Sequence, residues 1–417
     1  MKCRPLTAWA SHLVNSQRLT RRRAFFRGML FVSILWLPTM TSGVPRDVPN
    51  EVAEVQDALY RLEFDRAEEA CNKMISRDPR DPTGYGFLSI VRWNLLLQAA
   101  ANLTLDDYST PTPFTKQKTY KPIEKESQEF HQITDKLVSL CENLLQQNPN
   151  DTRALYFLGL ANENLSSEQL AVLKSRGQGI HYGKKAMEIH RRVLIQDPDF
   201  VDANLSIATG EFAAATLPWG LKFIAFLLGY RGNREEALAK LETVAERGVY
   251  RPLDARVVLA LLQAWKGDPN QAIQILASLG KRFPMNYLIE INRAAILEGR
   301  LKDRRAALDV YFALLEKIDV VGKLGLMPGE VHHRIGKTYY GLREYSKALE
   351  AFDAAIHSKV SEAETVPLSH YYIACISEEQ GDKQQAIEHF RLVLKYTGPE
   401  EVLEDELKEA RKKTRSS

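Results

Sequence analysis

The chain has 417 residues, of which 45% are hydrophobic and 26% are charged. These are ordinary values for a folded soluble protein, and they exclude wholesale disorder, a collagen-like chain and a polytopic membrane protein. The formal net charge is +3, but residues 1–43 hold seven basic and no acidic side chains, which leaves 49 basic and 53 acidic ones in the remainder. Such a mildly acidic body lacks the basic footprint of a nucleic-acid-binding protein.

The first 43 residues have the pattern of an export signal. Met1–Arg27 is basic, and small residues precede Val44. The apolar centre, Met29–Leu37, is about half as long as the roughly 20 residues that a membrane-spanning helix needs. We expect cleavage after Gly43. Arg22–Arg27 resembles the twin-arginine export pattern, while a Sec signal and an uncleaved anchor are the alternatives. All three predict that the body is exported to the periplasm or cell envelope of a bacterium.

The rest of the chain contains a recurring unit of two helices. The clearest copy runs from Ile335-Gly336 and Tyr339 through Ala348 to Phe352. Alignment on the alanine of the second helix, helix B, finds the further copies at Ala67, Ala186, Ala237, Ala272, Ala307 and Ala386. Ala237, Ala272 and Ala307 follow one another at intervals of 35 residues. The next two intervals, to Ala348 and Ala386, are 41 and 38 residues, which predicts short insertions late in the chain.

This pattern resembles the tetratricopeptide repeat (TPR) family. The resemblance implies an all-α fold, a TPR-type α-solenoid of about eight antiparallel helix pairs over residues 44–398. Small residues at the glycine and alanine positions let helix A approach helix B, and large residues fill the space to the next pair. The resemblance is degenerate over residues 82–250. Residues 399–417 are expected to form a polar C-terminal capping helix and tail, and no segment has convincing strand periodicity.

Repeats two to four are expected to have enlarged connections between helix A and helix B. The insertions are Asn102–Pro122, Ser166–Gly179 and Thr216–Tyr230, and such connections meet at one edge of a stack, where long loops are often functional. The third insertion is apolar around one lysine. Its candidate contact residues for a lipid surface or an envelope partner are Trp219, Lys222, Phe223 and Phe226. The alternative is a local subcore formed by the three insertions.

Residues for catalysis, cofactor binding or metal binding do not form any recognisable constellation, and we expect a protein without enzymatic activity. Arg176–Lys185 is rich in glycine, but its spacing departs from a phosphate-binding loop, so we predict a turn before a helix. Cys71 and Cys141 occupy the large position of helix B in different repeats, so we predict buried, reduced thiols. His332 is expected to face the core.

The TPR resemblance also implies a concave groove, lined by the A helices, that binds an extended peptide or a partner helix. The corresponding positions are Arg153, Tyr156 and Glu163 in the third repeat, Trp265 in the fifth, Glu330, His333, Lys337 and Tyr340 in the seventh, and Tyr371 and Glu378 in the eighth. A solvated concave face without a dedicated ligand is the alternative.

The leading functional hypothesis is a non-enzymatic protein–protein interaction scaffold of the periplasm or cell envelope. Two alternatives come from other classes of protein. One is a membrane-surface assembly factor that uses the apolar residues 217–228, and the other is an accessory subunit of an envelope enzyme that uses the irregular region 82–250. We expect protein partners and no cofactor, nucleic acid or small-molecule substrate.

Overall fold

The computed structural model describes residues 49–100, 123–216, 232–361, 363–398, 400 and 403–415. These residues belong to one compact unit, Arg46–Ser417, and they contain helices and short connections but no strand. The predicted signal or anchor, residues 1–43, lies outside this description.

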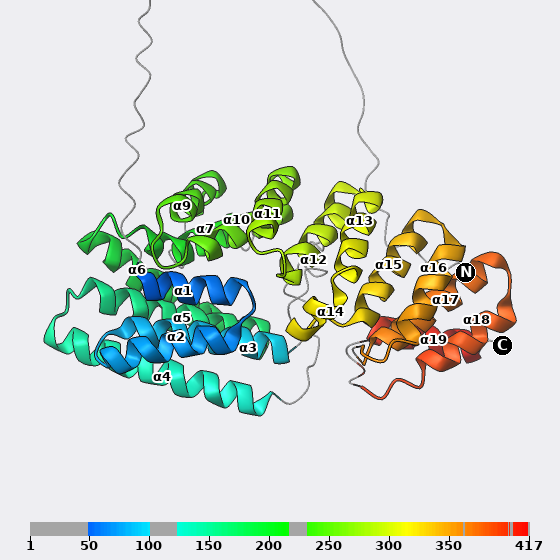
Figure 1. The fold of residues 1–417 in the computed structure, drawn as a ribbon, viewed down its shortest axis with the longest axis horizontal. Coiled ribbons are helices and arrows are strands. Elements are labelled where there is room, and N and C mark those ends of the chain that lie inside the picture. The colour runs from blue at the N-terminus through cyan, green and yellow to red at the C-terminus, as the bar shows by residue number, and fades with distance from the viewer. Residues whose placement is uncertain are drawn as a thin grey trace, which may run out of the picture. The chain divides into compact units, whose positions relative to one another are not determined.

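The described helices form eight antiparallel pairs that follow one another along the chain (Figure 1). The pairs are α1 (Asn50–Tyr60) with α2 (Phe64–Arg77), α3 (Pro82–Ala99) with α4 (Glu124–Gln147), α5 (Thr152–Ala171) with α6 (Arg176–Gln196), α7 (Asn204–Thr216) with α9 (Arg234–Arg247), α10 (Pro252–Lys266) with α11 (Pro269–Arg282), α12 (Tyr287–Ile296) with α13 (Arg304–Leu315), α15 (Pro328–Leu342) with α16 (Tyr345–Ile356), and α17 (Thr365–Gln380) with α18 (Lys383–Val393). The all-α solenoid of about eight repeats is therefore confirmed.

The alanines that defined the repeat in the sequence all lie at the contact between helix A and helix B. All seven are buried. Only a small side chain fits where two helices approach each other closely. In the seventh repeat, a methyl group added to Gly336 would lie 2.6 Å from the ring of Phe352. The glycine therefore allows the ring of helix B to lie directly against helix A.

Helix B of the first three repeats ends by the same device. The residue after each helix, Asp78, Asn148 or Asp197, is extended and directly precedes a proline. The ring of a proline disfavours the helical conformation of the residue before it, so the helix ends there. The next helix A then begins at a capping aspartate in two of these repeats. For example, Asp151 accepts a hydrogen bond from the backbone N–H of Ala154 at 2.9 Å.

The second predicted insertion is helical rather than a loop. Residues 166–171 complete α5, and the supposed glycine-rich turn is the first part of α6, so that only residues 172–175 connect the two helices. Gly179 is buried, and its carbonyl accepts a hydrogen bond from the Ser166 hydroxyl at 2.7 Å. The added residues thus lengthen and join the two helices. The other two predicted insertions fall mostly on residues outside the description.

A satellite core lies where the extended helices of repeats two and three meet. Leu96, Phe130 and Leu165 are buried in it, and the partly buried side chains around it are Trp93, Ile123, Val172 and Tyr182. This cluster explains why extra helical length is stable here, because the additional turns bury apolar surface of their own.

The late insertions predicted from the spacing of the alanines are present. The first contains the short helices α14 (Ile318–Val321) and η4 (Gly322–Leu324), and the second is the connection between α16 and α17. Val321 joins the core between α12 and α15. The carbonyl of Leu324 accepts a hydrogen bond from the amide of Gln98, at the end of α3, at 3.3 Å.

The polar helix expected near the C-terminus is α19 (Glu404–Arg415). Leu407 and Ala410 are its buried side chains, and it packs against α17 and α18. The remaining short helical elements are η2 (Val201–Ala203) and the π-helical turn η3 (Leu297–Leu301).

The predicted environment of two cysteines is confirmed. Cys71 and Cys141 are buried free thiols. Burial raises the pKa of the Cys71 thiol well above its usual range and that of Cys141 to about 12. Both side chains therefore act as small apolar core residues, because the reactive thiolate form is strongly disfavoured.

Candidate functional site

The predicted groove begins with Arg153 at the start of α5. Its guanidinium donates a hydrogen bond to the carboxylate of Asp81 at 2.8 Å, and the side chain is exposed. A small cleft of about 70 Å³ lies beside it, lined in part by Arg153, Tyr250, Glu51 and Arg77. Glu51 and Arg77 form an ion pair with each other. The cleft is therefore rimmed by charges that are already paired within the chain.

Tyr156 is buried rather than presented to a groove. Its ring stacks on Tyr250 with 5.3 Å between the centroids, and the ring of Phe200 lies 4.8 Å away. Burial, with a smaller effect of the nearby carboxylate of Asp202, raises the pKa of the Tyr156 hydroxyl well above its usual range. Tyr250 belongs to the connection between α9 and α10, so a residue from another repeat covers the position that the sequence assigned to a partner.

Glu163, further along α5, is also engaged by the chain itself. Arg251 donates to its carboxylate at 2.7 Å and to that of Asp254 at 2.6 Å. Both acidic residues lie on A helices, in the third and fifth repeats. The arginine therefore bridges two positions that would face a ligand in an open groove.

Asp202 fixes the connection that carries Tyr250 and Arg251. Its carboxylate accepts hydrogen bonds from the backbone N–H groups of Val249, Tyr250 and Arg251 at 2.8, 3.0 and 2.8 Å. Burial raises the pKa of this carboxyl even though three donors favour its charged form. Sequence reasoning missed Asp202, Tyr250 and Arg251, because the repeat pattern does not include the connections between repeats.

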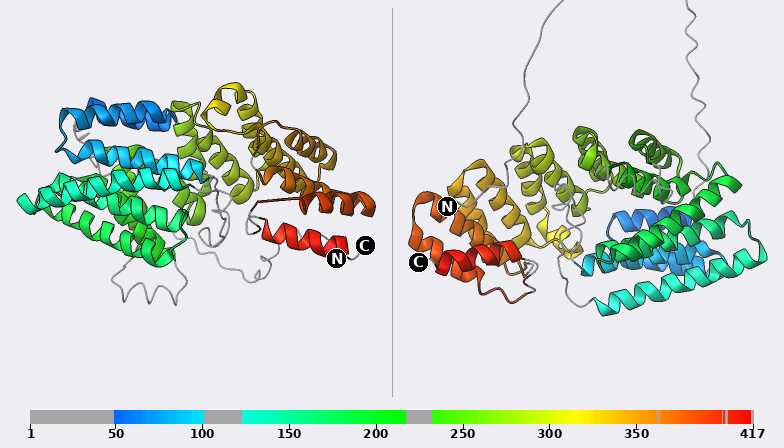
Figure 2. Two further views of the ribbon diagram at one scale, coloured as in Figure 1. Left: turned by 90° about the horizontal axis from the view of Figure 1, so that it is seen from below. Right: turned by 180° about the vertical axis from the view of Figure 1, so that it is seen from behind.

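Helix α1 closes the inner side of the first five repeats. The Gln56 amide donates to the carbonyls of Val249 and Tyr250 at 3.0 and 2.9 Å, and the Tyr60 hydroxyl donates to Asp254 at 2.9 Å. The end of α1 lies beside the α10–α12 region in Figures 1 and 2. Tyr60 and Trp265 each lie seven residues before the alanine of their helix B, Ala67 and Ala272, so Tyr60 occupies a groove position of the first repeat. Because Tyr60 bonds to Asp254 of α10, the groove sides of repeats one and five contact each other.

The contact continues into the sixth repeat. Asn286, just before α12, donates a hydrogen bond to the carbonyl of Tyr60 at 2.9 Å, and the Tyr60 ring lies 5.3 Å from that of Phe283. Leu62, which follows α1, is part of the core of α12 and α13. A peptide therefore cannot enter the groove along these repeats without displacing α1.

Trp265 lies near the end of α10 and is partly buried. Its ring contacts that of Phe212 in α7, with 6.1 Å between the centroids, and the ammonium of Lys266 lies 5.5 Å from the ring. The tryptophan therefore contributes to the packing of the fourth repeat against the fifth.

His333, in the seventh repeat, fills the space between repeats seven and eight. Its Nδ1 lies 2.9 Å from the hydroxyl of Ser369 in α17, and its ring contacts those of both Phe352 and Tyr372. His332, which was expected to face the core, is partly buried, and its neighbour His333 is the more deeply buried of the two. The hydrogen bond to Ser369 and the two aromatic contacts hold His333 inward.

The other groove positions of the seventh repeat lie along α15. Glu330 pairs with Arg334 at 2.7 Å, and the Tyr340 hydroxyl donates a hydrogen bond to Glu379 of α17 at 2.9 Å. The Lys337 side chain is half-buried. In the eighth repeat, Tyr371 donates to Glu409 at 2.8 Å, and Glu378 accepts from Lys413 at 2.6 Å. Both partners belong to α19, which therefore packs beside α17 as a further helix A would.

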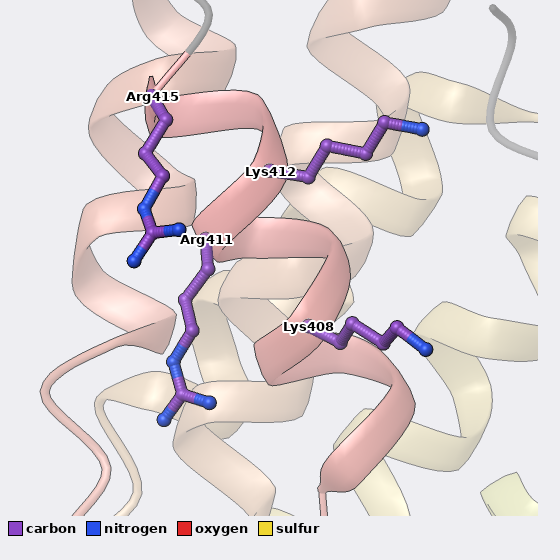
Figure 3. Close-up of a pocket in the computed structure, with 4 residues that line it drawn as sticks. All are labelled: Lys408, Arg411, Lys412 and Arg415. Carbon is purple, nitrogen blue, oxygen red and sulfur yellow. The ribbon is translucent and has the colours of Figure 1, made fainter.

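A second charged surface lies on the outer side of α19. Lys408, Arg411, Lys412 and Arg415 share one face, with the lysines extending to one side and the arginines to the other (Figure 3). Arg411 donates to Glu400 at 2.5 Å. Basic residues in the last turns of a helix complement the partial negative charge of its C-terminus, which accounts for this cluster without a ligand.

The candidate contact residues Trp219, Lys222, Phe223 and Phe226 lie outside the described residues. Within the described part of the chain, no three His, Cys, Asp or Glu side chains gather where they could hold a metal ion. No helix in that part is long and apolar enough to cross a membrane.

Family models of the tetratricopeptide repeat match residues 254–284 and 333–400. These matches cover the fifth, seventh and eighth helix pairs, and the remaining pairs repeat the same geometry. The chain therefore contains tetratricopeptide repeats in these segments. Proteins with this architecture are generally non-enzymatic scaffolds for protein–protein interaction.

Solved structures with similar folds include the APC/C hetero-tetramer Cut9–Hcn1, with a TM-score of 0.46 and 14% identity over 86% of this chain and 55% of that one. The match thus spans about half the length of that relative. A tetratricopeptide repeat protein from Parabacteroides merdae has a TM-score of 0.32 and 13% identity, and the match covers 77% of this chain and 97% of that one. Yeast Tom70 has a TM-score of 0.37 and 11% identity, and the match covers 88% of each chain. TM-scores below 0.5 add nothing to the assignment. A search of the curated proteins finds no match.

Proposed function

We propose that this TPR scaffold binds a protein partner on the concave side of its seventh and eighth repeats. What supports this location is the closure of the groove by α1, whose Gln56 and Tyr60 are bonded to Val249, Tyr250 and Asp254. The side chains at the corresponding positions of α15 and α17 bond instead to the neighbouring helices α17 and α19, and no distant repeat is bonded across them in the described residues. They include the aromatic side chains of Tyr340 and Tyr371, a type that is enriched in protein-binding surfaces.

Site-specific photo-crosslinking in cells tests this location. A photoreactive residue at Lys337 or at the exposed Glu379 should give a discrete adduct with another protein. The same residue at Gln56 in the closed part, or at the exposed Glu350 on the outer helix α16, should give none. Adducts at Gln56 with none at Lys337 would instead indicate that α1 moves aside and that the first five repeats hold the partner.

We further propose that the protein works in the periplasm or cell envelope of a bacterium. The basic segment, short apolar centre and small residues before Val44 support this proposal. A reporter that is active only after export, fused after Val44, should be active and should lose its activity when Met29–Leu37 is interrupted by charged residues. A reporter that stays cytoplasmic and uncleaved contradicts the proposal.

A further inference from the structure

The α5–α6 hairpin extends beyond the length of an ordinary repeat. Its helices have 20 and 21 residues, whereas helices of later repeats such as α13 and α16 have 12. At about 1.5 Å per residue, the hairpin is roughly 12 Å longer. The satellite core of Leu96, Phe130 and Leu165 supports the extension, and the connection of residues 172–175 forms its far end.

Two large aliphatic side chains are exposed at this far end. Leu173 is 51% exposed and Ile180 is 56% exposed. Gly179 is buried against Leu170 and Ser166, so the neighbouring Ile180 points away from the hairpin interior. Most large apolar side chains of the described residues lie in the cores, and Leu173 and Ile180 are among the few that are exposed.

The same end is basic. Arg176 at the start of α6 is exposed, as are Lys184 and Lys185 about two turns further along the helix, and no acidic residue occurs from position 169 to position 187. Arg176, Ile180 and Lys184 follow at intervals of four and therefore share one face of α6. The nearest acidic residues in the sequence are Glu168, which is buried, and Glu188, whose carboxylate lies 3.8 Å from the ammonium of Lys184. Positive charge therefore gathers at one place on an otherwise mildly acidic body.

We propose that this surface, the hairpin tip of Leu173, Arg176, Ile180, Lys184 and Lys185, docks on a membrane surface that contains anionic phospholipid. Aliphatic side chains flanked by cations are the combination that binds an anionic bilayer, because the cations meet the headgroups while the apolar groups enter the boundary of the acyl chains. An acidic protein would need an apolar surface of its own opposite Leu173 and Ile180, whereas a bilayer supplies one beneath its headgroups. The proposal is independent of the partner surface on repeats seven and eight.

An environment-sensitive dye tests contact at the tip itself. The dye is attached to an Ile180→Cys variant of the full chain that also carries Cys3→Ser; Cys71, Cys141 and Cys375 are buried and protected from labelling. Vesicles of phosphatidylcholine with about 30% phosphatidylglycerol should shift the emission to the blue, and pure phosphatidylcholine should not. The matched control is Ile195→Cys, a position 77% exposed at the other end of α6, which should not respond.

Charge reversal tests the role of the cations. The triple variant Arg176→Glu, Lys184→Glu and Lys185→Glu should raise the lipid concentration needed for half of the dye response by at least about a hundredfold, since each basic side chain near an anionic surface strengthens binding by about fivefold and each glutamate is repelled. The control reverses the exposed Lys359, Lys383 and Arg391 elsewhere and should change the response less than about twofold. Both triple variants carry the same net charge and the same N-terminal segment.

Several results would overturn the proposal. A dye at position 180 that does not respond, or responds equally to neutral vesicles, would do so, and so would an equal effect of the two triple variants. The same response to soluble polyglutamate without lipid would indicate an acidic protein instead. A lower melting temperature of Ile180→Cys would also overturn it, because it would mean that the side chain supports the fold rather than a surface.

Discussion

Phe352 lies at the contact between the last two repeats, where one side chain holds several helices together. Its ring is fully buried and stacks on Tyr372 of α17, with 5.4 Å between the centroids, while the bare backbone of Gly336 lies against its other side. Removing the ring would leave a cavity that a rigid pair of helices cannot close.

We therefore expect Phe352→Ala to lower the free energy of unfolding by about 3–5 kcal/mol. Chemical denaturation of the variant measures this loss. The control is Phe312→Ala, which removes the same ring from a side chain that is 41% exposed on α13 and should lower the stability by less than about 1 kcal/mol. Similar losses in the two variants would mean that Phe352 is not a packing centre.

The positions of single residues were predictable where the repeat itself constrains them. The seven alanines and Phe352 are buried because two helices must approach closely there. Tyr156 and His333 could not be placed in the same way. Each is covered by a side chain from outside its own repeat, Tyr250 in one case and Ser369 in the other, and no offset within a repeat encodes that contact.

At the scale of helices, the α4–α5 contact contains a buried carboxylate paired with a partly exposed histidine. The carboxylate of Glu168 is completely buried, and it accepts hydrogen bonds from His131 at 2.9 Å and from Ser127 at 3.3 Å. The hydrogen bond to Glu168 raises the pKa of His131. The folded protein therefore binds this proton more tightly than the unfolded chain does, and the pair favours folding most when His131 is charged.

The contribution of this pair to stability should depend on pH. It is complete below the unfolded pKa of histidine, near 6.5, and is lost as the pH rises through the higher folded pKa. We expect His131→Gln to lower the free energy of unfolding more at about pH 5.5 than at about pH 8.5. Comparison with the parent at each pH cancels the titration of the other histidines. An equal loss at both values would show that the contact with Glu168 does not depend on charge.

Helices and their pairing were predictable from the period of the sequence, but the lengths of the connections were not. The glycines of residues 176–183 suggested a turn, since glycine disfavours helix in isolation. In the structure, Gly179 lies in α6 because its missing side chain makes room for Leu170 of α5. Packing between the two helices thus outweighs the local preference for a turn.

At the scale of the whole repeat array, α1 connects parts of the chain that are far apart in sequence. Repeat proteins are usually held together by contacts between neighbouring repeats only. Here Gln56 and Tyr60 bond to residues 193 and 194 positions later. The sequence could not predict this closure, because it depends on small rotations that accumulate over five repeats and that no single repeat determines.

We expect the double variant Gln56→Ala and Tyr60→Phe to lower the free energy of unfolding by about 1–3 kcal/mol, since it removes three hydrogen bonds. Amide hydrogen exchange should become faster at Val249–Asp254 while α15–α18 are unaffected. The control is Thr243→Ala, whose hydroxyl bonds only to Ala239 of its own helix. Unchanged exchange at Val249–Asp254 in the double variant would mean that α1 does not hold the first five repeats closed.

This closure also sets an order for events during synthesis. Helix α1 leaves the ribosome first, but its bonding partners Val249, Tyr250 and Asp254 are made 193 or 194 residues later. At about 5–20 residues per second, roughly 10–40 s pass before α1 can complete its contacts. The early repeats must therefore form from neighbouring contacts alone, with Tyr156 and Phe200 still lacking the ring that covers them. A nascent chain that stops before Tyr250 would present these aromatic side chains to chaperones.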